Sequence, residues 1–373
     1  MPQLPSLICP SCHLPIAGVE SAGKVPVATQ FDDCLRRCEP CGIGASNASD
    51  RGAVTFIHRD PLGNIPVESR EGASEALAQA LNIRNRESKR RRFGFSTSED
   101  AVTWVVFMHL LRSGQLLGSL RQAGLITDSA LMATPTLLLW GAPVDAGARG
   151  KEIQGRLREL CAGLREDPIS FSEPDVIVDF GEHGVMFIEV KHQSGNDLKP
   201  VDYAGWPRYA SAAPFAWRIE YVKGSGCYEL ARNWCLVRLL SDGRPATLVN
   251  LGPSRLFGGA EGARLDRFVT ALDTDDRSRF AKVAWSDLLT QGLADAPGWF
   301  SRFCRERGLI VLAAASRCRC RGGARLRQSY TRKEPMHSPD GTALRGRHPF
   351  ATAKPPELTG LAPSFATRFA SAR

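Results

Sequence analysis

The alternation of apolar and polar residues is most regular between residues 98 and 313, where it predicts closely spaced helices and strands. Residues 151–164 form the clearest amphipathic helix, because apolar residues recur at spacings of four, three and four from Ile153 to Leu164. Ser98 suits the N-cap of an earlier helix that runs to about residue 111, since acidic residues follow it in the first turn.

Short apolar runs predict strands at 136–140, 176–180, 185–191 and 246–251. Further helical patterns cover 228–240, 264–272, 285–289 and 299–306. Helices and strands therefore alternate along this part of the chain, with two strands in direct succession near its middle. This order predicts an α/β domain in which helices flank a central mixed sheet.

Composition divides the 373 residues into four regions. Residues 1–50 carry five of the eleven cysteines, and we expect a zinc ribbon there. Residues 51–97 hold a short β-like run at 53–58, a helical stretch at 74–83 and a basic run at 84–92, and we expect a linker. Residues 98–313 form the main domain, and residues 314–373 lack any periodicity, which predicts a disordered basic tail.

The net charge of +9 lies entirely in the tail. Residues 1–314 hold 36 basic and 36 acidic residues, whereas the last 59 residues hold 12 and 3. The body is therefore neutral overall, and its isoelectric point does not by itself indicate that it binds nucleic acid.

The chain lacks the signals of a membrane or secreted protein. Its longest apolar run covers the seven residues 309–315, and a membrane-spanning helix needs roughly 20. The N-terminal residues lack the basic start and apolar stretch of a secretory signal, so we expect a cytoplasmic protein. In a reducing compartment its cysteines are thiols or metal ligands.

Two C-x2-C pairs, Cys9-Pro-Ser-Cys12 and Cys38-Glu-Pro-Cys41, are separated by 25 residues. Each pair lets two thiolates reach one tetrahedral ion, and zinc is the usual occupant. We therefore expect Cys9, Cys12, Cys38 and Cys41 to bind zinc, against the alternative that they are unliganded thiols. Cys34 and His13 lie close enough in sequence to replace a ligand. Whether the ribbon is structural or touches nucleic acid stays open.

A second group of candidate residues lies in the two successive strands. Side chains alternate along a strand, so Glu189 and Lys191 share one face, and Asp175 and Asp179 lie opposite the apolar face of the preceding strand. Carboxylates placed close together repel each other unless something compensates their charge. A divalent ion such as Mg²⁺ or Mn²⁺ supplies that compensation and assists displacement at phosphorus. The alternative is a solvent-facing hairpin that merely alternates polar with apolar residues and has no catalytic role.

The metal-site interpretation depends on the register of this hairpin. Opposite residues of an antiparallel pair point to the same face, so Asp175 faces Glu189 only if the connection has an odd number of residues. A four-residue connection over Gly181–Gly184 turns the two carboxylates to opposite faces. We therefore expect three or five residues, or a bulge.

The spacing of Pro174-Asp175, thirteen residues and Glu189-Val190-Lys191 resembles the PD-(D/E)XK nuclease superfamily, whose core is helix, three strands, helix, strand. The predicted order fits that core if 151–164 is an insertion between the first two strands. With the cysteine pairs and the segment RRRFGFSTSEDAVTW, residues 5–312 are similar to bacterial restriction-endonuclease-like proteins of this superfamily. The resemblance implies that Asp175, Glu189 and the carbonyl of Val190 hold Mg²⁺, that Lys191 is catalytic and that Glu99 is a supplementary acid.

Other features carry less weight. One branch of the superfamily has Gln-x-x-x-Tyr on the next helix, where this chain has Glu229 and Asn233, so membership in that branch is not indicated. Gln193 either contacts the phosphate or ends the strand. The run Lys89-Arg90-Arg91-Arg92 either grips a DNA backbone or is a solvated linker.

The resulting hypothesis is a metal-dependent endonuclease that hydrolyses DNA phosphodiester bonds through a Mg²⁺-activated water, in restriction or phage defence. One alternative is a catalytically inactive zinc-containing protein that binds nucleic acid. Another is a nuclease acting on RNA or on repair intermediates. We expect DNA as the partner and no association with a membrane, and the sequence allows a homodimer.

Overall fold

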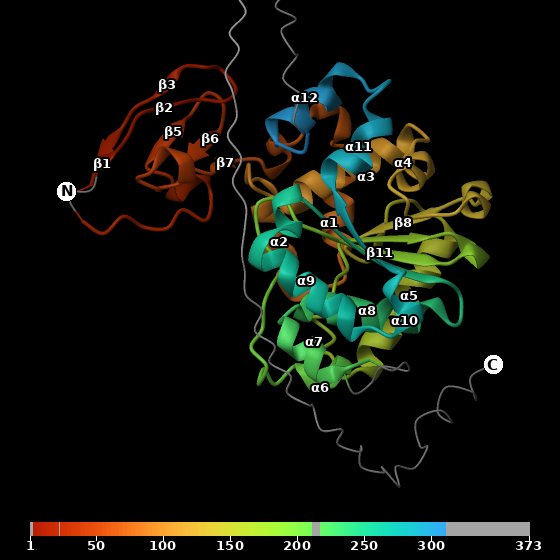
Figure 1. The fold of residues 1–373 in the computed structure, drawn as a ribbon. Helices are drawn as coiled ribbons and strands as arrows, with labels where there is room; N and C mark the ends of the chain where they lie inside the picture. The colour runs from red at the N-terminus through yellow and green to blue at the C-terminus, as the bar shows by residue number, and fades with distance from the viewer. Residues whose placement is uncertain (1–2, 22, 211–216, 311–373) are drawn as a thin grey trace, which may run out of the picture. The chain divides into compact units, whose positions relative to one another are not determined.

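The computed structural model describes residues 3–21, 23–210 and 217–310, and a mixed β-sheet is its central element (Figure 1). Six strands of the described residues form this sheet, in the order β13-β12-β11-β10-β8-β9. Neighbours from β9 to β11 are antiparallel, whereas β12 runs parallel to β11 and to β13. The strands are β8 (Thr136–Leu139), β9 (Ala142–Pro143), β10 (Val176–Asp179), β11 (Val185–Val190), β12 (Ala246–Gly252) and β13 (Phe280–Ala284).

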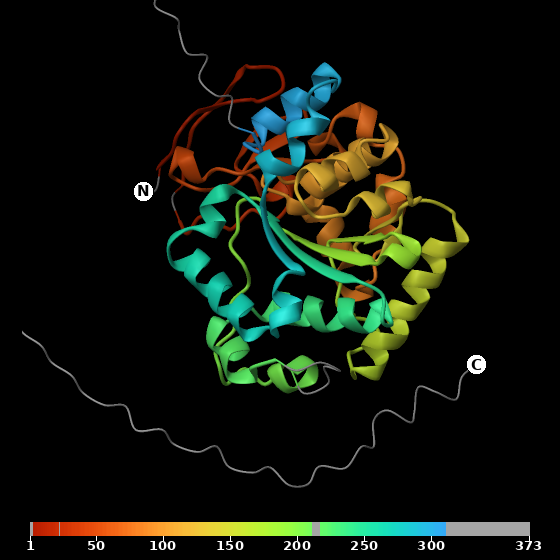
Figure 2. The ribbon, with the colours of Figure 1, turned by 45° about the vertical axis from the view of Figure 1, so that its right-hand side comes forward.

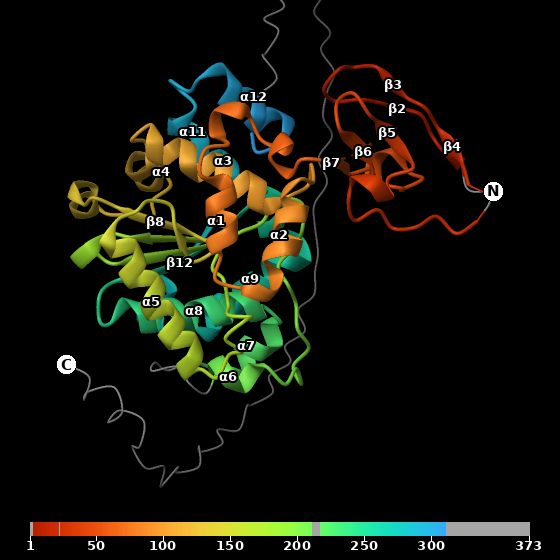
Figure 3. The same cartoon turned by 180° about the vertical axis from the view of Figure 1, so that it is seen from behind.

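Helices cover both faces of the sheet (Figures 1 and 3). One face lies under α3 (Glu99–Arg112), α4 (Leu116–Gln122), α11 (Trp285–Gly292) and α12 (Gly298–Glu306), together with α1 (Ala73–Gln79) and α2 (Arg86–Phe93). The opposite face lies over α5 (Ala148–Gly163), α8 (Tyr228–Ser241) and α9 (Gly259–Ala271). The shorter helices α6 (Trp206–Ala210), α7 (Ile219–Ser225) and α10 (Thr274–Arg277) lie beside this second layer.

The strand sequences explain why the sheet needs cover on both faces. Val176 and Val178 of β10 belong to the hydrophobic cluster on the α3 side, whereas Ile177 belongs to the cluster on the α8 side. Every residue of β11 is buried. A strand that is apolar on both faces is stable only between two layers, and the turned view shows the sheet between them (Figure 2).

The predicted elements of the main domain are present, together with six that the pattern did not predict: α4, α6, α7, α10, β9 and β13. Ser98 caps α3, since its Oγ accepts a hydrogen bond from the backbone N–H of Ala101 at 3.2 Å. The pattern missed β13, whose five residues include the polar Lys282, and it missed α2, which we had taken as a basic run. Residues 51–97, expected as a linker, are folded, because apolar residues of α1 and α2 such as Leu77 and Phe93 belong to the core.

The N-terminal segment consists of short antiparallel strands: β1 (Gln3–Leu4), β2 (Leu7–Ile8), β3 (Pro15–Ile16), β4 (Val19–Glu20), β5 (Arg36–Cys38), β6 (Ile43–Ala45) and β7 (Phe56–His58). β7 lies beyond residue 50, where we had expected the ribbon to end, and it pairs with β6. Ile57 forms a bridge with Phe95, which ties this segment to the residues before α3.

No helix of the described residues is long and apolar enough to cross a membrane. The predicted disordered tail, residues 314–373, lies outside the part of the chain that the structure describes.

Candidate functional site

The hairpin of β10 and β11 brings Asp175 and Glu189 to one face of the sheet. β10 ends at Asp179 opposite Val185, so residues 180–184 form a five-residue connection. Extending this register by one residue places Asp175 opposite Glu189, and opposite residues point to the same face. The prediction of an odd-numbered connection is therefore confirmed.

Asp175 lies directly before β10, and its carboxylate is held by the neighbouring strand. The backbone N–H of Val190 donates a hydrogen bond to Asp175 Oδ2 at 2.8 Å. The second oxygen, Oδ1, has no hydrogen-bond partner among the described residues. Burial, followed by the charge of Glu189, raises the pKa of Asp175 well above its usual value. An added positive charge at this place would therefore stabilise the ionised carboxylate.

Helix α8 supplies the partners of Glu189 and Lys191. The ammonium of Lys191 donates to Glu189 Oε1 at 2.7 Å and to Glu229 Oε2 at 3.0 Å. Asn233 Nδ2 donates to Glu189 Oε2 at 2.7 Å. Glu189 and Lys191 are 3% and 7% exposed, so these bonds fix two charged groups that have lost most of their water.

The charges of this group compensate one another. Burial alone would lower the pKa of Lys191, but Glu189 and Glu229 raise it well above its usual value. Burial alone would raise the pKa of Glu229, but Lys191 and Arg232 lower it to about 2. Glu229 and Asn233 lie four residues apart and therefore share one face of α8, which is the face toward Lys191 and Glu189.

A second buried lysine, Lys89, lies near enough to Asp175 for their charges to interact. Lys89 of α2 forms ion pairs with Asp100 at 2.9 Å and with Glu173 at 3.3 Å, and its ammonium lies 5.0 Å from the ring centroid of Trp140. Burial alone would lower its pKa, but Asp100, Glu173 and then Asp175 raise it. Lys89 is thus part of the site, in contrast to both interpretations that its basic sequence allowed.

The carboxylate of Glu99 makes its hydrogen bonds to the segment just after Lys191. Its Oε1 accepts hydrogen bonds from the backbone N–H of His192 at 2.7 Å and from Ser194 Oγ at 2.6 Å. Its charge is one of those that raise the pKa of Lys191. Glu99 therefore approaches the site from the start of α3, and its role as a supplementary acid stays a prediction.

Asp179, the other acid of β10, lies at the far end of the strand. Its carboxylate accepts hydrogen bonds from Arg149 of α5 at 3.1 Å and from Arg244 at 2.8 Å, and it is 1% exposed. These two guanidinium groups compensate its charge. Asp179 therefore serves the packing of α5 on the sheet and takes no part in the group around Glu189.

The neighbouring side chains offer two carboxylates to a hard divalent cation. Asp175 and Glu189 offer carboxylate oxygens, the ligand type that Mg²⁺ prefers, and Oδ1 of Asp175 is free to bind. No third carboxylate completes the set, because the described residues contain no close group of three or more acidic or histidine ligands here. Mg²⁺ usually keeps several waters and binds through one or two carboxylates, so two carboxylates fit the ion.

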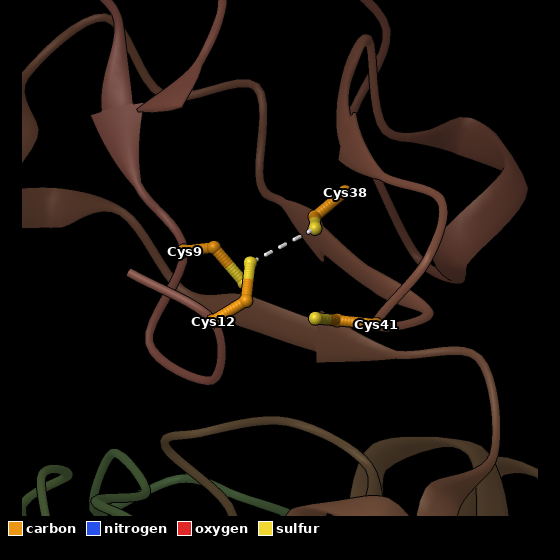
Figure 4. A group of neighbouring side chains, drawn as sticks. All are labelled: Cys9, Cys12, Cys38 and Cys41. Atoms are coloured by element: carbon orange, nitrogen blue, oxygen red, sulfur yellow. Dashed lines mark hydrogen bonds between the residues drawn. The ribbon is translucent and has the colours of Figure 1, made fainter. Parts of the chain in front are cut away.

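Four cysteines converge near the N-terminus (Figure 4). The sulfur atoms of Cys9, Cys12, Cys38 and Cys41 all lie within 4.8 Å of one another, and those of Cys12 and Cys38 are 3.7 Å apart. Four sulfurs at about 2.3 Å from one tetrahedral ion lie about 3.8 Å from each other. The four cysteines can therefore hold a metal ion such as zinc, as the spacing predicted.

The backbone of the two cysteine turns is alike. The residue after each second cysteine has a positive φ, at 59° for His13 and 62° for Gly42. The sharp reversal turns both sulfurs of a pair toward the same point. His13 and Cys34, the two alternative ligands, are not part of the group. Cys34 is instead buried beside Ala28 and Ile57, and burial raises the pKa of its thiol to about 11.

No family model matches the chain, and neither a curated protein nor a solved structure matches it.

Sequence reasoning brought forward Asp175, Glu189 and Lys191, but it missed their partners. Glu229 and Asn233 were visible in the sequence, and their four-residue spacing on a helix after the strand was the available signal. Lys89 gave no signal, because its burial depends on carboxylates that lie 11 and 84 residues further along the chain.

Proposed function

We propose that this protein is a metal-dependent nuclease that hydrolyses phosphodiester bonds in DNA. The observation that carries the proposal is the common face of Asp175 and Glu189, with Lys191 hydrogen-bonded to Glu189 at 2.7 Å. The order of the elements also agrees with the core of the PD-(D/E)XK superfamily, since α3, the antiparallel strands β8, β10 and β11, α8 and the parallel strand β12 occur in this order, with α5 inserted between β8 and β10.

In this proposal Asp175, Glu189 and the carbonyl of Val190 hold Mg²⁺ or Mn²⁺. The ion would supply charge neutralisation at the phosphate and an activated water. Lys191 has three N–H donors, and the structure gives partners to two of them, Glu189 and Glu229. The third donor is left to bind a phosphate oxygen or to orient the attacking water.

The helix α8 and the segment after β11 orient these groups. Asn233 holds one oxygen of Glu189, so the other oxygen keeps a fixed direction toward Lys191. Trp285 Nε1 donates to the carbonyl of Lys191 at 2.9 Å, and Glu99 binds the next backbone N–H. A site whose charged side chains are fixed before substrate binds needs little reorganisation during the reaction.

The cysteine group is proposed to bind zinc for a structural purpose. Four cysteines without an open position are typical of structural zinc, whereas catalytic zinc keeps a site for water. An inactive nucleic-acid-binding protein is the less supported alternative, because such a protein has no need for a buried carboxylate and a buried lysine, Glu189 and Lys191, hydrogen-bonded to each other.

A cleavage assay tests the proposal. Purified protein is incubated with supercoiled plasmid and with labelled oligonucleotide duplexes, with and without Mg²⁺. We expect wild-type protein to cut only with Mg²⁺, and Lys191→Ala to abolish cutting. Lys199→Ala is the matched control, since Lys199 also pairs with a carboxylate, Asp197, but is more exposed. Cutting by Lys191→Ala at the wild-type rate would refute the proposal.

A further inference from the structure

The basic run of α2 divides into one buried and three exposed cations. Lys89 is 8% exposed and contacts Asp100 and Glu173, beside Asp175. Lys89 and Phe93 lie four residues apart on the buried side of the helix. The helix is therefore attached to the candidate site through its own lysine.

Arg90, Arg91 and Arg92 follow directly and are exposed. None of them forms an ion pair or a side-chain hydrogen bond within the part of the chain that the structure describes. A helix rises 1.5 Å per residue, so all three lie within about 5 Å of Lys89 along the helix axis. We call these three residues the α2 arginine surface.

Charge at this surface is not balanced by its surroundings. Glu87, the helix's one acidic residue, lies three and four residues before Arg90 and Arg91, but it stands against five basic residues, and Arg86 and Arg90 have the four-residue spacing at which like charges repel. Residues 1–314 are neutral overall, so three exposed arginines that have no ion pair among the described residues give a local positive potential around α2. An anionic partner at this place would remove the repulsion.

From this arrangement we infer that the α2 arginine surface binds the sugar–phosphate backbone of nucleic acid next to the bond that is cut. The guanidinium group is always charged, and its planar fork matches the oxygens of a phosphate. This inference rests on the proposed function and adds the surface along which the substrate lies. Binding through phosphates is independent of base sequence and weakens with salt.

The test compares two triple variants in a Lys191→Ala background, so that binding is measured without cutting. The first is R90Q/R91Q/R92Q, and glutamine keeps the helix propensity of arginine. The matched control is K151Q/R158Q/R165Q, which removes three exposed cations on and just after α5 that have no ion pair among the described residues. The C-terminal tail is the same in every variant, so its contribution cancels.

The dissociation constant of a labelled mixed-sequence duplex is measured over a range of KCl concentrations without Mg²⁺. For R90Q/R91Q/R92Q we expect an increase of at least about tenfold at moderate salt. The slope of log Kd against log salt should fall by about three, one for each phosphate contact that is lost. The control triple variant should change neither quantity.

Three results would overturn the inference. Unchanged affinity and slope in R90Q/R91Q/R92Q, while wild-type protein cuts duplex DNA with Mg²⁺, would refute the surface and leave the proposed function standing. Loss of binding to phosphatidylserine vesicles, with duplex binding unchanged, would assign the arginines to a membrane surface. If wild-type protein cuts no nucleic acid and the triple variant binds duplex normally, the proposed function and the inference both fail.

Discussion

Single residues at the candidate site are held by charge pairs from which most water has been excluded. Lys89 and Lys191 each contact two carboxylates, and both lysines are buried. Removing one partner of such a pair leaves a charge that neither water nor protein compensates. The residues of this site should therefore affect stability as well as activity.

Lys89→Met tests this effect at a residue that is not itself a proposed metal ligand. Because Asp100 and Glu173 lose their cation, we expect the free energy of unfolding to fall by about 3–5 kcal/mol, measured by urea denaturation. Lys199→Met is the control, since its ion pair with Asp197 is more exposed and should be worth less than about 1 kcal/mol. Equal losses in the two variants would contradict the buried network.

Asn233 is expected to orient Glu189 through its hydrogen bond to Oε2. Asn233→Ala should raise the Mg²⁺ concentration needed for half-maximal cutting, or lower the rate, by about 10–100-fold, because partners of metal ligands typically have effects of this size. A thermal unfolding curve controls for loss of structure. A Mg²⁺ titration identical to that of the wild type would show that Asn233 has no part in holding Glu189.

The core residues of the site could be predicted because strand alternation is local. Asp175, Glu189 and Lys191 need only the two-residue period and the length of one connection. Lys89 could not be found in this way, because a run of four basic residues suggests solvent and only the tertiary fold brings Glu173 to it.

At the scale of elements, the two cysteine turns depend on an ion to keep four thiols together. Cys38→Ala should abolish stoichiometric zinc in metal analysis of the purified protein, because three remaining sulfurs hold the ion less well. We expect the first 50 residues to become more accessible to limited proteolysis, while the helical circular dichroism of the main domain is retained. Absence of zinc from the wild-type protein would show that the cysteines are not a zinc site.

The free energy of unfolding depends on pH through His58, the last residue of strand β7. Burial, followed by the charges of Arg307 and Arg70, lowers the pKa of His58 to about 4. The unfolded chain therefore takes up a proton between pH of about 6.5 and 4 that the folded chain does not, and stability falls as the pH falls through this window. We expect a loss of roughly 3 kcal/mol relative to His58→Gln, measured by urea denaturation at several pH values. Parallel pH profiles for the two proteins would contradict this assignment.

Most helices and strands of the main domain could be predicted because their apolar residues recur with a clear period. Two of the elements that the pattern missed, β13 and α2, were missed for physical reasons. β13 is short and carries Lys282, which pairs with Asp266 of α9, so its pattern is not purely apolar. α2 contains five basic residues in eight, and tertiary contacts with α1, α3 and the turn at Pro61–Asn64 hold it as a helix against the core.

Across the whole molecule, one mixed sheet organises both the core and the candidate site. Its two faces are covered by separate hydrophobic clusters, and the charged group lies where β11 ends against α8 and the start of α3. This position suits a catalytic site, because the strands and helices that hold the charged side chains are themselves fixed by packing and so keep those side chains in place.

The rate of duplex cleavage as a function of Mg²⁺ concentration, compared between wild type and Asp175→Asn, tests the central claim most directly. Asparagine keeps an acceptor for the N–H of Val190 and resembles the neutral carboxyl that burial favours, so the fold should be retained. The account predicts that the wild-type cleavage rate depends saturably on Mg²⁺ concentration. In the variant we expect the rate to fall by at least about a thousandfold, which corresponds to about 4 kcal/mol of lost transition-state stabilisation. Cleavage by Asp175→Asn at the wild-type rate, or cleavage that does not depend on a divalent ion, would contradict it.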